Sequence, residues 1–202
     1  MPLEARNAGY GYDKNHWLFR DMNLKLEQGE VVGLWGPSGS GKTSLGRILA
    51  GYAEPMAGEV LMDGKSLPRA GVCPVQLVFQ HPEKAVNPRW RMRRVLHEAE
   101  MAEHPVLNAL GIQPEWLDRR PDELSGGELQ RFCVARALGK ETRYLIADEM
   151  TTMLDAITQA QIWHTVLATA RQRNVGLLVI SHDLDLLNRL CYRIIPMPVS
   201  QL

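Results

Sequence analysis

The chain has few cysteines, and none stands in a pattern that binds metal. Cys73, Cys133 and Cys191 are far apart, odd in number and in no CxxC or His-paired spacing. This pattern predicts neither a disulfide framework nor a zinc site. We therefore expect three buried free thiols.

The chain also lacks an excess of either charge and any long apolar run. Among 202 residues, 23 Lys and Arg balance 23 Asp and Glu. No net field draws the protein to nucleic acid, so we expect no nucleic-acid partner. Apolar runs such as residues 175–180 (VGLLVI) are too short to span a bilayer, and the first residues do not begin a secretory signal. These absences predict a cytoplasmic protein.

What the chain does have is an alternation of strand and helix patterns, which predicts one α/β domain over residues 1–202. A helical pattern follows the first buried strand and ends at Gly51. Asp63-Gly64 predicts a hairpin turn, so an antiparallel piece is expected beside a mainly parallel sheet. Buried strands are expected at residues 31–35, 76–79, 144–147 and 175–180.

The pattern changes to short helical pieces from about residue 88 to residue 121. Pro105, Gly111 and Pro114 interrupt these pieces, which predicts an inserted helical subdomain. The subdomain leads into a helix expected over residues 128–138, so we place it at about residues 88–138.

Residues 36–43 (GPSGSGKT) fit the phosphate-loop pattern and follow a predicted strand. The glycines allow backbone amides to wrap phosphates, and Lys42 is expected to reach the β and γ phosphates. The Thr43 hydroxyl is expected to bind Mg²⁺. The predicted ATP-binding residues of this segment are Gly36, Ser38, Gly39, Ser40, Gly41, Lys42, Thr43 and Ser44.

Polar side chains also follow three other predicted strands. Asp148 and Glu149 end the strand at 144–147, where α/β sheets place ligands. Asp148 is expected to hold Mg²⁺, and Glu149 to polarise the attacking water, which is worth roughly 10²- to 10⁴-fold in rate. The amide of Gln80 is expected to approach Mg²⁺ or the attacking water, and His182 to donate a hydrogen bond to the γ-phosphate. The predicted metal ligands are Thr43, Gln80 and Asp148.

Residues 124–131 (LSGGELQR), here called the signature segment, stand between these motifs. The phosphate loop, Gln80, signature segment, paired acids, Asp155 and His182 occur in the order and approximate spacing of ATP-binding-cassette (ABC) ATPases. The chain resembles that family from about residue 10 to 190. The resemblance implies two cassettes that meet head to tail, with Asp155 linking their sites. The residues that would contact the partner's ATP are Ser125, Gly126, Gly127 and Glu128.

The resemblance also implies an adenine-stacking aromatic residue upstream of the phosphate loop. Tyr12 is the best match, with Tyr10 as its rival. Stacking of this kind contributes about 1 to 3 kcal/mol.

Residues 78–82 (VFQHP) and 86–89 (VNPR) carry a narrower resemblance, to ATP-binding subunits of importers for peptides, nickel and metal chelates. It implies separate integral membrane permeases, an indirectly reached periplasmic or extracellular solute-binding protein, and a peripheral position on the cytoplasmic face of the inner membrane. Two departures concern the segment before Asp155: Met150 stands where the family usually has Pro, and Thr152-Met153 replaces Ser-Ala.

Two other functions remain open. One is a non-transport ABC ATPase of a soluble complex, of the phosphonate carbon–phosphorus lyase type. The other is a non-catalytic, ATP-gated assembly module. DNA-repair and chromosome ATPases generally place a long coiled coil before the signature segment, and the chain shows none.

The chain has one basic cluster, which surrounds Trp90. A solvated helical face is favoured over a contact with acidic lipid or a membrane partner. The cluster consists of Arg89, Arg91, Arg93 and Arg94.

Overall fold

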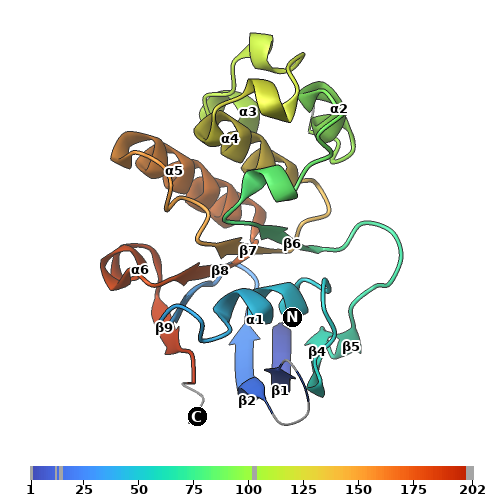
Figure 1. Cartoon of the computed structure of the whole chain (residues 1–202), viewed down its shortest axis with the longest axis vertical. Helices are drawn as coiled ribbons and strands as arrows, with labels where there is room; N and C mark the ends of the chain where they lie inside the picture. The colour runs from blue at the N-terminus through green and yellow to red at the C-terminus, as the bar shows by residue number, and fades with distance from the viewer. Residues whose placement is uncertain (1, 12, 14–15, 102–103, 199–202) are drawn as a thin grey trace.

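The computed structural model describes residues 2–11, 13, 16–101 and 104–198, and contains two sheets (Figure 1). The five-stranded sheet has the order β6-β7-β8-β3-β9, and all its neighbouring strands are parallel. Its strands are β3 (Val31–Trp35), β6 (Val75–Val78), β7 (Tyr144–Asp148), β8 (Gly176–Ser181) and β9 (Arg193–Pro196). The second sheet is antiparallel, has the order β2-β1-β4-β5, and consists of β1 (Leu3–Gly11), β2 (Trp17–Leu26), β4 (Ala57–Met62) and β5 (Lys65–Ser66).

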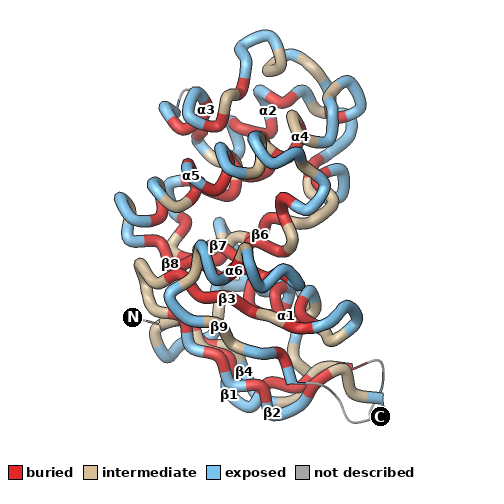
Figure 2. The backbone as a smooth tube through the Cα atoms, turned by 90° about the vertical axis from the view of Figure 1, so that its left-hand side faces the viewer, coloured by how far each residue is buried: buried red, intermediate tan, exposed pale blue. Residues whose placement is uncertain are grey.

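Helices cover the parallel sheet on both faces. In Figures 1 and 2, α1 lies on one side of the parallel strands, and α4 and α5 lie on the other. None of the helices among the described residues combines the length and apolarity needed to cross a bilayer. The α-helices are α1 (Lys42–Leu49), α2 (Met92–His97), α3 (Val106–Ala109), α4 (Gly126–Ala137), α5 (Ala156–Arg173) and α6 (Leu184–Leu190), and the 3-10 turns are η1 (Pro82–Lys84), η2 (Pro114–Trp116) and η3 (Pro121–Glu123).

The apolar strand runs exist because both faces of the sheet are buried. Val32, Leu34 and Ile146 pack with α1 and the antiparallel sheet. Their chain neighbours Val31 and Leu145 pack with α4, α5 and the helical subdomain. Successive residues of a strand point to opposite faces, so a strand covered on both sides reads as a continuous apolar run.

The predicted hairpin is confirmed, and the antiparallel sheet is larger than expected. Asp63 and Gly64 both have positive φ, 55° and 75°, and join β4 to β5. Strands β1, β2 and β9 were not predicted from the sequence. Positive φ at Asn7 and Asp21 and register shifts along β1 break the simple alternation that marks a strand.

Helix α4 begins at Gly126, two residues before the predicted start. Ser125 caps it: the backbone N–H of Glu128 donates to Ser125 Oγ at 3.3 Å, and the N–H of Ser125 donates to Glu128 Oε2 at 2.8 Å. This capping box draws Gly126 and Gly127 into the first helical turn.

All three cysteines are free, as predicted, but only Cys133 is fully buried. Cys73 and Cys191 are half-buried, which corrects the expectation of three buried thiols. Burial raises the pKa of Cys133 and of Cys191 to about 12, so both remain protonated thiols at neutral pH.

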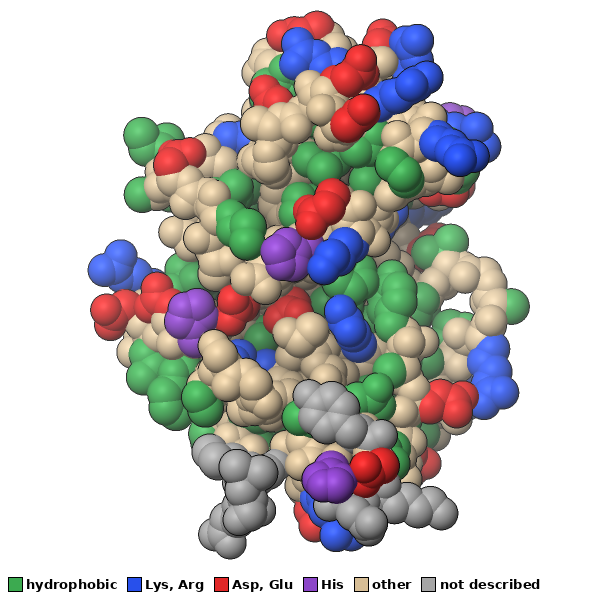
Figure 3. All heavy atoms as spheres, viewed as in Figure 1, with side chains coloured by type: hydrophobic (Ala, Val, Ile, Leu, Met, Phe, Trp, Pro, Cys, Tyr) green, Lys and Arg blue, Asp and Glu red, His purple; other side chains and the backbone are tan. Residues whose placement is uncertain are grey.

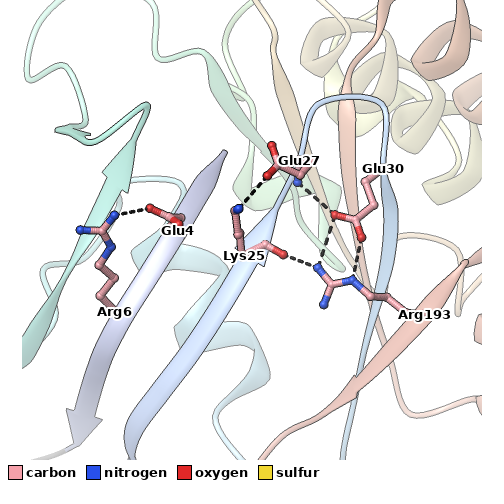
Figure 4. A network of polar contacts seen from close by, with 6 residues as sticks. All are labelled: Glu4, Arg6, Lys25, Glu27, Glu30 and Arg193. Carbon is pink, nitrogen blue, oxygen red and sulfur yellow. Dashed lines mark hydrogen bonds and ion pairs between the residues drawn. The ribbon is translucent and has the colours of Figure 1, made fainter. Parts of the chain in front are cut away.

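A polar network joins the two sheets near the end of the chain (Figure 4). Arg193 of β9 pairs with Glu30, with Nε 2.6 Å from Oε1, and also donates to the backbone oxygen of Lys25 in β2. The N–H of Glu27 donates to Glu30 Oε2 at 3.0 Å. These contacts fix the turn between β2 and β3, and β3 delivers the phosphate loop.

Candidate functional site

The phosphate loop, the paired acids and His182 gather at one edge of the parallel sheet. Trp35 of β3 pairs with Ser181 of β8, and Asp148 of β7 pairs with Ile180 of β8, so these strands end together. The phosphate loop, Asp148-Glu149 and His182 therefore emerge at the same edge. Ligands of open α/β sheets bind at this edge.

The phosphate loop adopts a conformation that only glycine accommodates easily. Gly41, at the N-terminus of α1, has φ 93°, and a Cβ added there would lie 2.8 Å from the ring of Phe19. Lys42 is only 6% exposed, and its Nζ donates to the backbone oxygens of Gly36 at 2.7 Å and Pro37 at 2.9 Å. The loop thus holds a positive charge beside its own backbone amides, a geometry suited to phosphate.

Asp148 is 3% exposed, and its Oδ1 has no hydrogen-bond partner among the described residues. Burial raises its pKa, against a hydrogen bond from Thr43 that lowers it. Within the described ranges, the buried Ser40 Oγ is unpartnered as well. Unpaired buried oxygens carry a desolvation cost that a hard cation or its bound water removes. The hydroxyl of Thr43 and the carboxylate of Asp148 are the ligand types that Mg²⁺ prefers, so the residues present fit this ion.

Glu149 is the point on which Gln80 and His182 converge. Its Oε1 lies 2.9 Å from His182 Nδ1, and its Oε2 accepts from Gln80 Nε2 at 3.3 Å. Its backbone is left-handed, with φ 47°, and its N–H donates to the oxygen of Ile180 at 3.0 Å. Such a conformation costs about 1 to 3 kcal/mol outside glycine and is typical of active sites.

The signature segment lies away from this cluster. Ser125 and Gly126 are exposed at the start of α4, on the opposite side of the parallel sheet from α1 (Figures 1 and 2). In the part of the chain that the structure describes, no recorded hydrogen bond or ion pair joins this segment to the phosphate loop. A Cβ at Gly126 would meet nothing within 4 Å, whereas one at Gly127 would lie 3.3 Å from Leu154. The capping box gives Glu128 a local function.

Asp155 also has a local function, as the N-cap of α5. Its Oδ1 accepts from the backbone N–H groups of Ile157 and Thr158, both at 3.0 Å. The Thr158 backbone N–H is the largest cause of the lowered pKa of Asp155. The Asp155 side chain is exposed. The preceding residue, Leu154, lies beside Gly127 of the signature segment.

The unusual segment between Glu149 and Asp155 is firmly attached to the core. Met150 is 2% exposed and packs in the core beneath α5. The buried hydroxyl of Thr151 accepts from Gln159 Nε2 at 2.8 Å and from Trp163 Nε1 at 3.0 Å. The packing of Met150, at the position where the family usually has Pro, and the hydrogen bonds of Thr151 therefore anchor this segment. Met153, by contrast, is 67% exposed.

The two candidates for adenine stacking have different outcomes. Tyr12 lies outside the described residues. Tyr10 is half-buried on β1, opposite Phe19, and packs against the core below α1. This packing makes Tyr10 the weaker candidate.

The basic cluster is partly neutralised. Lys and Arg side chains gather around the corner that holds α2 (Figure 3). Arg93 pairs with Asp118 at 3.2 Å, and the guanidinium of Arg94 lies 4.0 Å from the ring centre of Trp90. These contacts fit the favoured interpretation of a solvated face.

Comparison with known proteins assigns the family. A family model described as "ABC transporter" matches residues 19–152. The chain belongs to the ABC transporter family. It is 35% identical to the nickel import ATP-binding protein NikE of Escherichia coli over 219 residues, which cover 98% of the chain and 81% of that protein. It is also 35% identical to the nickel import system ATP-binding protein NikE of Staphylococcus aureus over 207 residues, which cover 96% of the chain and 85% of that protein.

Solved ABC structures share the fold. An ATP-binding subunit of an ABC transporter has a TM-score of 0.83 at 20% identity, covering 98% of this chain and 86% of its own. A dimeric bacterial ABC transporter cassette has a TM-score of 0.83 at 23% identity, covering 98% and 97%. The predicted ABC cassette fold and the resemblance to nickel-importer subunits are confirmed. The chain is an ATP-binding ABC ATPase.

Two residues of this ABC ATPase were not singled out from the sequence. They are Thr151, which anchors the segment after Glu149, and Gln130, which contacts the segment that holds Gln80. Gln130 lay within the quoted signature segment, but its contact joins positions 51 residues apart, so no local pattern marks it.

Proposed function

We propose that this ABC ATPase binds ATP with Mg²⁺ at the edge of the parallel sheet and hydrolyses it to energise an importer with separate permease subunits. The observation that carries the catalytic part is the convergence of Gln80 and His182 on Glu149, beside buried Asp148. If Asp148 and Glu149 only capped the following segment, nothing would require the amide of Gln80 and the imidazole of His182 to contact Glu149.

In this proposal the phosphate loop binds the nucleotide. Its backbone amides and Lys42 hold the phosphates, and Tyr12 stacks on adenine. Thr43 and Asp148 hold Mg²⁺, with the amide oxygen of Gln80 as a third ligand. The ion supplies charge neutralisation at the β and γ phosphates.

Glu149 orients and polarises the attacking water, because its carboxylate is held from two sides, by Gln80 and by His182. His182 contacts Glu149 through Nδ1. Donation from its Nε2 to the γ-phosphate at the same time requires an N–H on both ring nitrogens, that is, the imidazolium form. The amide oxygen of Gln80 would hold Mg²⁺, while its nitrogen donates to Glu149.

The proposed functional unit is a head-to-tail pair of cassettes. The exposed N-terminus of α4 and the sheet between α4 and α1 support it, since the signature segment is turned away from this chain's own phosphate loop. Asp155 would link the two sites from the N-terminus of α5. The similarity of the fold to a dimeric cassette is consistent with this pairing.

The proposed cargo is nickel, with peptides and metal chelates as the related classes, because the relatives reported above are nickel import proteins. The proposed position is peripheral, on permeases at the cytoplasmic face of the membrane, with a solute-binding protein reached indirectly. Affinity capture of the tagged chain from native membranes is expected to recover integral membrane permeases and a second cassette. Recovery of a soluble lyase complex instead would favour the non-transport alternative.

The head-to-tail arrangement predicts an asymmetric effect of Ser125→Asp. Aspartate retains the cap of α4 but places a negative charge where the partner's γ-phosphate would lie. In a pair of distinguishable cassettes, hydrolysis is expected to fall about tenfold or more at the partner's phosphate loop. Nucleotide trapping, with labelled nucleotide assigned to each subunit, measures this.

The site that contains Lys42 serves as the internal reference for this variant. Loss at that site alone would contradict the head-to-tail arrangement. Ser125→Asn, which keeps the cap without the charge, separates electrostatic repulsion from a change in the helix.

A further inference from the structure

The buried side-chain amide of Gln130 in helix α4 makes a hydrogen bond to the segment that holds Gln80. Gln130 is 2% exposed, and its Nε2 donates to the backbone oxygen of Phe79 at 3.2 Å. One turn further along α4, the Sγ of Cys133 lies 3.7 Å from the backbone oxygen of Pro82. The two contacts bracket Gln80 on both sides along the chain.

Packing alone does not account for a glutamine at this position. The Oε1 of Gln130 is buried and has no hydrogen-bond partner among the described residues. An unpaired buried amide oxygen is destabilising, whereas an apolar side chain of the same length would fill the space without this cost. The bond that Gln130 makes to Phe79 is therefore the feature that distinguishes it from an apolar residue.

The contact is the first of two hydrogen bonds that lead from α4 to Glu149. The oxygen of Phe79 belongs to the peptide group that precedes Gln80, so its position sets where the side chain of Gln80 begins. Gln80 in turn donates to Glu149 Oε2 at 3.3 Å. The same helix carries Ser125 at its N-terminus, five residues before Gln130.

We infer that Gln130 is a positioning residue that fixes the Phe79–Gln80 peptide to α4, so that the helix proposed to contact the partner's ATP also sets the geometry of this chain's own Glu149. A shift of α4 on contact with the partner moves the Phe79 oxygen and, with it, Gln80. This coupling rests on the proposed function and deepens it, since it joins the two ATP sites of a cassette pair through one side chain.

Gln130→Met tests the inference, because methionine keeps the length and burial of the side chain but removes the donor. We expect turnover to fall about three- to tenfold, as for the loss of one buried hydrogen bond that positions a reacting group, with nucleotide affinity unchanged. The thermal unfolding midpoint is expected to remain or rise, since the unpaired oxygen is removed as well. Measurements use the full chain in its captured assembly.

Thr165→Val is the matched control. It removes a hydroxyl whose Oγ1 lies 3.1 Å from the oxygen of Ala109 in the helical subdomain and 3.0 Å from the oxygen of Gln161 in its own helix. Among the described residues, no hydrogen bond joins Thr165 to Phe79. Turnover of this variant is expected to match the parent. Amide hydrogen exchange of residues 79–81 is expected to rise in Gln130→Met and to stay unchanged in the control.

A double-mutant cycle with Gln80→Ala separates positioning from general loosening. The loss caused by Gln130→Met is expected to disappear when Gln80 is already absent. Equal losses in both backgrounds, or parental turnover and exchange in Gln130→Met, would overturn the inference. If Gln80→Ala alone stops turnover, the amide exchange of residues 79–81 decides: a rise in Gln130→Met supports the inference, and parental exchange overturns it. A parent chain without ATP hydrolysis would instead contradict the proposed function.

Discussion

Glu149→Gln is expected to lower ATP turnover roughly 10²- to 10⁴-fold, equivalent to about 3 to 5 kcal/mol of activation free energy, while ATP binding is retained. The glutamine keeps the size of the side chain but has only one acceptor oxygen for Gln80 and His182, and it carries no negative charge to polarise water. Steady-state phosphate release from the captured assembly, together with equilibrium binding of ATP, measures both halves of this expectation.

Glu141→Gln is the control for this experiment. It makes the same chemical change at an exposed position just before β7 and is expected to leave turnover unchanged. Unchanged hydrolysis in Glu149→Gln would refute the assignment of the catalytic carboxylate. An assembly that binds ATP but never hydrolyses it, even with the parent chain, would favour the non-catalytic assembly module.

Lys42→Met is expected to weaken ATP binding by on the order of 3 kcal/mol, roughly a hundredfold in Kd. The ammonium group is buried and held by the oxygens of Gly36 and Pro37, inside the loop proposed to bind the phosphates. Methionine keeps the apolar stem and removes the charge and both hydrogen bonds. Titration calorimetry with a non-hydrolysable ATP analogue gives the affinity directly.

Lys140→Met provides the comparison, since Lys140 is exposed at the turn before β7. Circular dichroism of both variants checks that the fold is retained. Parental affinity in Lys42→Met would contradict the phosphate-binding assignment, whereas a loss in both variants would indicate a general electrostatic effect rather than a site.

The sequence predicted the central strands well because their burial leaves a local signature. Strand β3 was predicted with the observed bounds, and β6, β7 and β8 were displaced by at most a residue at either end. A strand covered on both faces is apolar throughout, so a short window identifies it. The strands of the antiparallel sheet were harder, because bulges and left-handed residues in β1 and β2 interrupt their alternation.

The start of α4 shows a different limit. Two consecutive glycines have low helix propensity, so the sequence favoured a turn before Glu128. The reciprocal bonds between Ser125 and Glu128 outweigh that propensity and extend the helix back over both glycines. The residues of the capping box are visible in the sequence. Whether its two hydrogen bonds outweigh the low helix propensity of the glycines is decided only in the folded chain.

The sequence by itself determined the family, the fold class and the chemical types present at the site. The phosphate loop and the paired acids are short contiguous motifs, so their chemistry is written in adjacent residues. Tertiary structure alone decided what surrounds Glu149, because Gln80 and His182 are 69 and 33 residues away from it along the chain. It also decided that Gln130 meets the Phe79 oxygen and that the signature segment is turned away from its own phosphate loop. Parallel strands bring their distant ends to one edge of the sheet, and no local pattern records which of those ends meet.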